Sequence, residues 1–218
     1  MIRVLVISGD FWHPAEIIRR GLEELPDAAD FRFDFVTDAK DTLYPEMLDD
    51  YDVIVSAKMD VIHEGNQHEW FQVGVTEVMP ADLRAWIEKG HGFIALHGGS
   101  SYYQTDKSGY VDMVGTYFVK HPDRCEIRMT IEAEHPVTKD VPDFTYRDEH
   151  YELAQVTDDL QILATSHSAA GGDQIGAFVR ELGAGRLCVL APGHILQTFR
   201  NPAYQKMISN ALRWCANI

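Results

Sequence analysis

The sequence predicts an α/β protein with a doubly wound, mostly parallel sheet and added antiparallel strands in its C-terminal half. Up to residue 97, short apolar runs, often β-branched, alternate with segments of helical spacing. Apolar runs without alternation are typical of strands that are buried on both faces, as the strands of parallel sheets are. Beyond residue 98 several strand-like segments follow one another without long helices between them. That succession favours antiparallel pairing.

The first strand is predicted at residues 2–8, a β-branched run that ends at Gly9 and Asp10. A helix follows at residues 14–25, where apolar residues recur at helical spacing behind an initial proline. The same order of strand and helix repeats, which predicts right-handed crossovers between parallel strands. Further strands are expected at residues 31–37, 52–56 and 92–97, and further helices at residues 44–50 and 79–89.

Residues 59–77 form a long polar stretch without a strong period, which indicates a functional loop. Its histidines His63 and His68 are five residues apart and do not form the HExxH zinc motif, so we interpret them as loop residues near the pocket. In the C-terminal half we expect a short helix at residues 111–115, strands at residues 125–132, 151–156, 160–165, 175–181 and 186–191, and a closing helix at residues 202–216.

Composition and charge restrict the classes of function. A chain of 218 residues fits one α/β domain over residues 1–218. Its 34 acidic residues against 19 Lys and Arg give a formal charge of −15, which repels phosphate backbones and anionic membranes. Nucleic-acid and membrane binding are therefore not expected, and a focused negative charge favours neutral sugars or cations over phosphorylated substrates.

The cysteines and the N-terminus indicate a cytoplasmic protein. Three cysteines lie far apart with no CxxC pair, which favours a reducing compartment. The first apolar run is about six residues long, too short for a signal sequence or a membrane span.

Three histidines follow predicted strands, where ligands of open α/β sheets bind. They are His13 after the first strand, His97 at the end of the fourth, and His194 after residues 186–191. A lone histidine is more often structural, but three at one sheet edge indicate a shared pocket. Such a cluster suits proton transfer, and with a carboxylate it suits Zn²⁺ or another transition metal.

Residues 146–151 add acids, a histidine and aromatics at one place. Asp148 or Glu149 can orient a histidine or serve as a base next to a carbonyl, with His150 and Tyr151 as neighbouring candidates for substrate binding. The alternative is a solvated loop between strands. Tyr102, Tyr103, Tyr151 and the tryptophans can stack on sugar rings, although aromatic side chains are more often core. His121 and His135 precede prolines at turns, where a structural role is favoured.

The segment His97-Gly98-Gly99-Ser100 invites comparison with a nucleophile elbow, a sharp turn that presents a Ser or Cys to the substrate. The G-x-S-x-G form is absent, and His97 stands where the nucleophile is expected. Glycines there let backbone N–H groups approach a ligand. Candidate substrate-binding residues are thus Asp10, His13, Gly98, Gly99, Ser100, Asp148, His150 and Tyr151.

Six segments in order resemble the ThuA-like (trehalose utilisation) family: residues 94–99, 113–118, 134–138, 147–151, 185–194 and 210–216. The resemblance implies a class I glutamine amidotransferase-like fold with a flavodoxin-like sheet. In the amidotransferases a Cys stands at the elbow and a partner His and Glu follow a later strand. Here His97 occupies the Cys position and His194 has no His-Pro-Glu arrangement, so no glutaminase activity is expected.

The resemblance also implies a role in sugar catabolism, beside a sugar 3-dehydrogenase that oxidises a sugar to its 3-keto form. Acid–base chemistry on such a keto-glycoside suits His97, His194 and Glu149 as catalytic residues. Some relatives bind zinc, which makes His13, His97 and His194 candidate ligands of a divalent metal such as Zn²⁺.

Three kinds of function stay open on the sequence. One is an enzyme, a lyase, isomerase or hydrolase, acting on a keto-sugar. Another is a non-catalytic carbohydrate- or metabolite-binding protein with the same pocket, and a third is a metal-dependent hydrolase with a different substrate. The sequence also does not determine the sugar, the bond that is altered or the oligomeric state, for which a homo-oligomer is one alternative.

Overall fold

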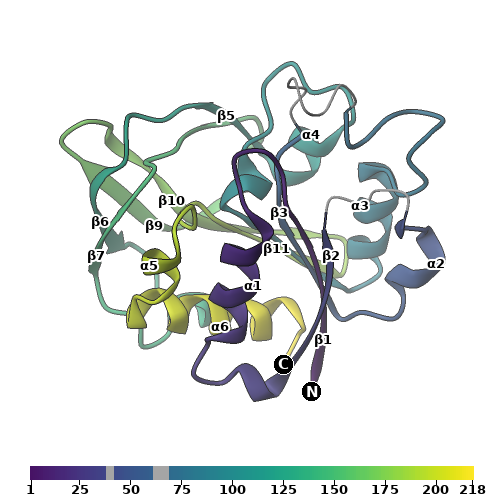
Figure 1. Cartoon of the computed structure of the whole chain (residues 1–218), viewed down its shortest axis with the longest axis horizontal. Helices are drawn as coiled ribbons and strands as arrows, with labels where there is room; N and C mark the ends of the chain where they lie inside the picture. Colours follow the sequence, from purple (N-terminus) through teal and green to yellow (C-terminus); the bar gives the residue numbers. More distant parts are fainter. Residues whose placement is uncertain (38–41, 61–68) are drawn as a thin grey trace.

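A computed structural model of the chain describes residues 1–37, 42–60 and 69–218. Its main feature is a nine-stranded sheet in the order β2-β1-β3-β4-β11-β10-β9-β6-β7, which combines strands from both ends of the chain (Figure 1). A smaller two-stranded sheet pairs β5 with β8.

The first half of the large sheet is parallel, as predicted. Its strands follow the order 2-1-3-4 of a flavodoxin-like sheet, with β11 added beside β4, also in parallel. These strands are apolar runs buried on both faces, apart from β2 at the sheet edge. Their bounds are β1 Ile2–Ser8, β2 Phe31–Thr37, β3 Val53–Ala57, β4 Gly92–Leu96 and β11 Gly185–Leu190.

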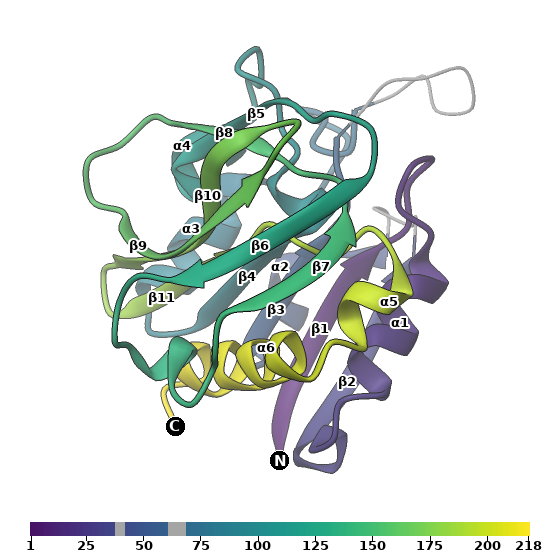
Figure 2. The ribbon, with the colours of Figure 1, turned by 90° about the vertical axis from the view of Figure 1, so that its left-hand side faces the viewer.

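The second half of the sheet is antiparallel, again as predicted. From β11 outward, β10, β9, β6 and β7 each pair antiparallel with their neighbour. Figure 2 shows β6 and β7 side by side on this flank of the molecule, with β5 and β8 above them. The bounds are β5 Thr116–Lys120, β6 Cys125–Ile131, β7 Phe144–Asp148, β8 Glu152–Gln155, β9 Gln161–Ser168 and β10 Gly172–Leu182.

Helices cover both faces of the sheet and give it two hydrophobic cores. On one face α1, α5 and α6 pack on the sheet through residues such as Ile18, Phe199 and Leu212. On the other face α2, α3 and α4 pack through Leu48, Trp86 and Val114. The bounds are α1 Ala15–Glu23, α2 Pro45–Leu48, α3 Pro80–Glu88, α4 Tyr110–Val114, α5 Leu196–Phe199 and α6 Pro202–Cys215, with single 3₁₀ turns at Ala28–Asp30, His97–Ser100 and Pro136–Thr138.

The predicted elements are found within a few residues of their expected bounds, and the sequence missed β5, β7 and α5. The expectation for His63 and His68 lies outside the described residues. Over the part of the chain that the structure describes, no helix has both the length and the apolarity needed to cross a bilayer.

Candidate functional site

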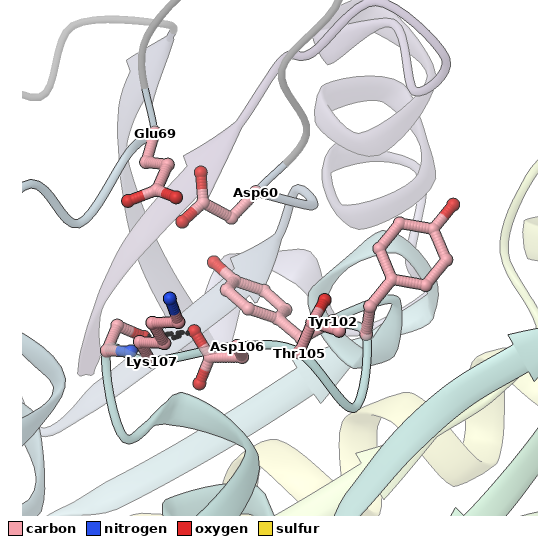
Figure 3. Close-up of a pocket in the computed structure, with 8 residues that line it drawn as sticks. Asp60, Glu69, Tyr102, Thr105, Asp106 and Lys107 are labelled. Carbon is pink, nitrogen blue, oxygen red and sulfur yellow. Dashed lines mark hydrogen bonds between the residues drawn. The ribbon is translucent and has the colours of Figure 1, made fainter.

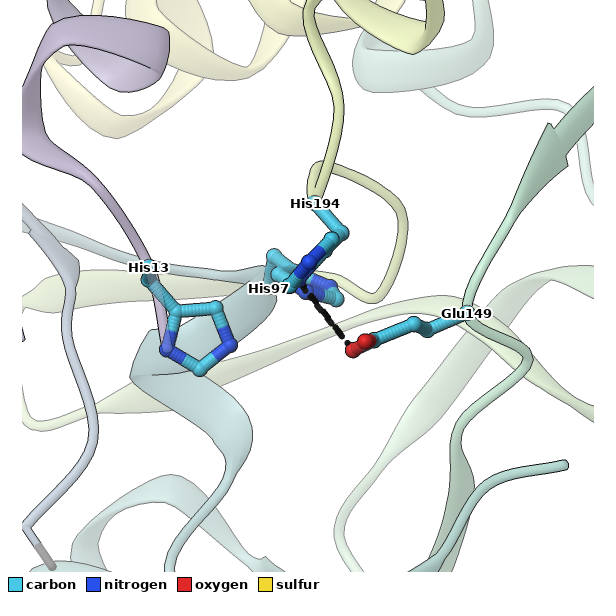
Figure 4. A group of neighbouring side chains, drawn as sticks. All are labelled: His13, His97, Glu149 and His194. Atoms are coloured by element: carbon cyan, nitrogen blue, oxygen red, sulfur yellow. Dashed lines mark hydrogen bonds and ion pairs between the residues drawn. The ribbon is translucent and has the colours of Figure 1, made fainter. Parts of the chain in front are cut away.

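Four side chains from distant segments meet beyond the carboxyl ends of the parallel strands: His13, His97, His194 and Glu149. His13 follows β1, His97 follows β4 and His194 follows β11, while Glu149 comes directly after β7. Figure 4 shows the Glu149 carboxylate pointing toward the imidazoles from its own strand. The structure thus brings together the three predicted histidines and the predicted carboxylate.

The ligand atoms of the four groups lie close to one another. The closest nitrogens of His97 and His194, Nε2 and Nδ1, are 3.3 Å apart. Glu149 Oε2 lies 3.2 Å from His194 Nδ1 and 3.6 Å from His97 Nε2. One ligand atom from each residue falls within 4.8 Å of all the others. His13 and His97 are buried, and His194 and Glu149 are partly exposed.

Hydrogen bonds outside the cluster orient two of the imidazoles. His13 Nδ1 lies 2.9 and 2.8 Å from the two carboxylate oxygens of Asp10, and His97 Nδ1 lies 2.9 Å from the carbonyl oxygen of Ala191. Because these oxygens only accept, each Nδ1 carries a proton, and the other ring nitrogen, Nε2, faces the cluster.

Asp10 is fixed in turn by backbone donors. Its carboxylate accepts N–H groups from Trp12, His13 and Met59 at 2.8 to 2.9 Å. The contact with Met59 ties the loop after β1 to the loop after β3. A histidine that binds a metal usually donates its other ring N–H to a carboxylate in this way.

When its imidazoles are neutral, the cluster contains more acceptors than protons. The Tyr151 hydroxyl lies 3.1 Å from His13 Nε2 and 3.0 Å from His97 Nε2, but its single proton can satisfy only one of them. Lone pairs and a carboxylate that face one another need a proton or a cation between them. Burial raises the pKa of Tyr151 well above its usual value, so its hydroxyl stays protonated.

The pKa shifts of His13, His194 and Glu149 favour the forms of these side chains that can bind a cation. Burial and the neighbouring charge of His97 lower the pKa of His194 to about 4, and burial also lowers the pKa of His13. Burial opposes ionisation of Glu149, but the hydrogen bond and charge of His97, with the charges of His194 and His121, outweigh it and lower the pKa of Glu149 to about 2. At neutral pH His13 and His194 are neutral and Glu149 is a carboxylate.

This donor set fits a divalent transition metal. Tetrahedral zinc with bonds of about 2.0–2.1 Å places neighbouring ligand atoms roughly 3.3–3.4 Å apart. The three distances among His97, His194 and Glu149 are 3.2 to 3.6 Å. Three imidazoles and one carboxylate are also ligands that zinc accepts.

Asp148, a predicted binding residue, instead holds two loops in place. It is fully buried, and its Oδ2 accepts the backbone N–H groups of Gly193 and His194 at 3.0 and 3.2 Å. Its Oδ1 accepts the N–H of Glu149 at 2.9 Å. One carboxylate thus positions the two cluster residues that come from the C-terminal half.

The turn after β4 has the backbone of an elbow. His97 has φ +44°, a left-handed conformation that is unusual for a residue with a side chain and is typical of strained functional turns. A Cβ on Gly98 would lie 2.8 Å from His13 Nδ1, and one on Gly99 would overlap the carbonyl oxygen of Ser56. These glycines let the turn pack against His13 and β3.

Two predicted binding residues do not reach the cluster. Both ring nitrogens of His150 are engaged elsewhere, with Ser168 Oγ at 2.7 Å and Ser166 Oγ at 2.9 Å, because its side chain turns toward β9. The Ser100 hydroxyl is buried and donates to the carbonyl oxygen of His97 at 2.8 Å. His150 therefore supports the sheet, and Ser100 supports the elbow.

A cavity of about 310 Å³ opens onto the cluster. It is lined by Trp12, His13, Met59, Ser101, Tyr103, Phe118, His121, Glu149 and Tyr151. Among these His121 was assigned a structural role on the sequence, yet its Nε2 lies 3.7 Å from Glu149 Oε2. The signal that would have found it is the strand β5, which ends one residue before His121.

A second cavity of about 270 Å³ adjoins the first, since Tyr103 lines both. Figure 3 shows Asp60 and Glu69 on one side of it and Asp106 and Lys107 on the other. Burial raises the pKa of the Asp60 carboxyl.

Comparisons with known proteins agree with this architecture. Crystal structures of ThuA-like proteins from Bacteroides uniformis and Parabacteroides merdae superpose with TM-scores of 0.75 and 0.78 at 18% and 15% identity. The alignments cover 98% and 99% of this chain and 91% and 90% of theirs. A glutamine amidotransferase from Thermotoga maritima has a TM-score of 0.63 at 11% identity, with 100% and 99% of the two chains covered. At these identities the likeness shows the fold alone, and it confirms the predicted amidotransferase-like architecture.

The family assignment comes from the sequence model. No curated protein sequence matches the chain significantly. The family model ThuA, described as trehalose utilisation, matches residues 3–215. The chain therefore belongs to the ThuA family, which implies a role in trehalose or sugar utilisation.

Proposed function

We propose that the protein is an enzyme of sugar catabolism that removes a proton next to the carbonyl of a keto-glycoside, at a centre formed by His13, His97, His194 and Glu149. The observation that carries this proposal is the convergence of three imidazoles and an ionised carboxylate, with ligand atoms within 4.8 Å of one another, beside a cavity. His13, His97 and His194 would hold a divalent cation such as Zn²⁺. When bound, that ion supplies polarisation of the substrate carbonyl.

Glu149 is the group best placed to take the proton. It belongs to the cluster and also lines the cavity, and its side chain is 13% exposed. Its low pKa keeps it ionised at neutral pH, so it is available as a base. The proton passes from the carbon beside the carbonyl to the carboxylate, and the electron pair moves to the carbonyl oxygen to form an enolate.

The enolate has two outcomes on a 3-keto-glycoside. Reprotonation with migration of the carbonyl gives an isomer. Alternatively the electron pair returns and expels the glycosidic oxygen at the next carbon, which then needs a proton. The Tyr151 hydroxyl, protonated and in contact with the cluster, is a candidate donor for that oxygen. The 3-keto substrate has to come from oxidation of a sugar, so a sugar 3-dehydrogenase would act before this protein.

Hydrogen–deuterium exchange tests this function directly. The zinc-loaded protein is incubated with 3-keto-trehalose in D₂O, and the proton beside the carbonyl is followed by NMR. We expect that signal to disappear with or before product formation, and Glu149→Gln to lose the exchange while still folding. Binding of the keto-sugar without exchange or product would contradict the proposal and leave a carbohydrate-binding protein.

A further inference from the structure

The cavity beside the cluster has an aromatic wall. Trp12 and Tyr103 stand at its mouth and are 54% and 45% exposed, while Phe118 and Tyr151 lie deeper and are buried. The rings of Tyr103 and Phe118 are 5.8 Å apart, those of Phe118 and Tyr151 are 4.8 Å apart, and Tyr151 stacks on His97 at 4.3 Å. Aromatic surface therefore continues from the mouth to the cluster.

The two mouth residues differ from the other aromatic candidates of the sequence. Tyr102 is buried and stacks on Tyr110 with ring centroids 3.7 Å apart, so it belongs to the core. The tryptophans other than Trp12 are buried as well: Trp70, Trp86 and Trp214. Large exposed rings that border a cavity lose apolar contact with water when a ligand covers them.

The chemistry of the cavity limits what can cover these rings. Its polar end holds Glu149 and His13, which need a ligand with hydroxyl or carbonyl groups. Its other end is aromatic and needs an apolar face. The chain's formal charge of −15 disfavours anions. A closed sugar ring has C–H groups on a face and hydroxyls on its edge, whereas an open-chain polyol has the hydroxyls without a rigid face.

We propose that Trp12 and Tyr103 are specificity-determining residues that bind the C–H face of a pyranose ring and select closed-ring glycosides over open-chain polyols. The inference rests on the proposed function in one respect, because it takes Glu149 as the base toward which the sugar ring is oriented. Phe118 supports Tyr103 through an edge-to-face ring contact. The role of Trp12 and Tyr103 is in binding and not in proton transfer.

Binding of trehalose and of sorbitol to the full zinc-loaded chain, measured by calorimetry, tests the inference. We expect the parent to bind trehalose more tightly than sorbitol. Trp12→Ala and Tyr103→Ala should each weaken trehalose binding about two- to tenfold, the range of one aromatic contact. Trp12→Phe and Tyr103→Phe, which keep a ring, should retain most of the affinity. Tyr44→Ala is the matched control, since Tyr44 is an exposed ring, 49% accessible, that does not line the cavity.

Tryptophan fluorescence locates the ligand in the same titration. Because Trp12 is the one exposed tryptophan of the four, trehalose should change the emission of the parent and of Tyr44→Ala, but not of Trp12→Phe. Equal affinity of the parent for trehalose and sorbitol, or unchanged trehalose affinity in both alanine variants, would overturn the inference.

The outcome is separable from that of the proposed function. If keto-sugar exchange occurs and KM is the same in Trp12→Ala and Tyr103→Ala as in the parent, the wall has no role and the enzyme assignment stands. If exchange is absent but trehalose binding depends on both rings, the wall is supported and the enzyme assignment fails.

Discussion

At the scale of single residues, the site is set by which atom each side chain presents. Asp10 and the Ala191 carbonyl each hold an imidazole proton away from the cluster, so that Nε2 of His13 and of His97 faces Glu149 and His194. The three histidines could be predicted from the sequence because each follows a strand end at one sheet edge. The orienting role of Asp10 could not, because it depends on a backbone contact with Met59, 49 residues away.

Replacing Asp10 tests whether the carboxylate that orients His13 contributes to zinc binding. Asp10→Asn keeps the size of the side chain but removes the charge that fixes His13, and we expect zinc affinity to fall about 10- to 100-fold. Competition with a chelator of known affinity measures this change. Asp49→Asn, an exposed carboxylate outside the cluster, should bind zinc as the parent does; equal losses in both variants would contradict the assignment.

The lowered pKa of His194 predicts how stability depends on pH. In the unfolded metal-free chain this imidazole takes up a proton near pH 6.5, whereas in the folded chain it does so near pH 4. The unfolded state therefore binds more protons between these values, and the free energy of unfolding should fall as the pH falls from about 6.5 to about 4. The lowered pKa of His13 acts in the same direction.

Denaturant unfolding of the metal-free protein at several pH values measures this slope. His194→Asn should make the slope between pH 6.5 and 4 shallower, while His167→Asn, an exposed histidine outside the cluster, controls for loss of one imidazole. Glu149 contributes mainly below this window, between about pH 4.5 and 2, where protonation of its paired carboxylate removes stability. A slope unchanged in His194→Asn would contradict the assigned shift.

At the scale of elements, the turn His97–Ser100 and the carboxyl end of β7 decide whether the cluster assembles. The elbow could be predicted from its glycines and its place after a strand. The strand β7 has the alternating burial of a half-buried strand, but it was missed because it is only five residues long and leads into the charged run Arg147-Asp148-Glu149, which also suits a solvated loop. His121 was missed for a related reason, since β5 gains its partner β8 from a segment far along the chain.

The two elbow glycines should respond differently to alanine. In Gly99→Ala the new methyl group meets the backbone of Ser56, so we expect a loss of about 3 kcal/mol or more in unfolding free energy. In Gly98→Ala the methyl group meets mainly the His13 ring rather than backbone, so the clash displaces a side chain of the cluster. That variant should fold but bind zinc more weakly. Denaturation and chelator competition on both variants separate the effects, and the reverse order of stability would contradict the packing described here.

Asp148 should act on both loops at once. Asp148→Ala leaves the N–H groups of Glu149, Gly193 and His194 without their buried acceptor, which should cost about 3 kcal/mol or more. Because it positions two cluster residues, zinc affinity should fall as well. Denaturation and chelator competition measure both quantities, and a stable variant with full zinc affinity would show that the loops hold their positions without this carboxylate.

At the scale of the whole molecule, the large sheet is parallel at one end and antiparallel at the other. Both parts contribute residues to the site. The parallel strands β1, β4 and β11 bring the histidines to one edge, and the antiparallel flank returns β7 so that Glu149 faces them (Figure 4). The alternation of strands and helices made the parallel half predictable. The approach of β7 depends on pairing between distant segments, which local sequence patterns do not specify.

The central claim is that His13, His97 and His194 form one metal-binding centre, with Glu149 beside it as the base. The most direct test is a zinc titration of the metal-free parent and of the double variant His97→Ala, His194→Ala, with chelator competition and circular dichroism to confirm the fold. We predict one tightly bound zinc per parent chain and no tight binding by the folded double variant. Equal zinc affinity of the two proteins, or no tight binding by the parent, would contradict it.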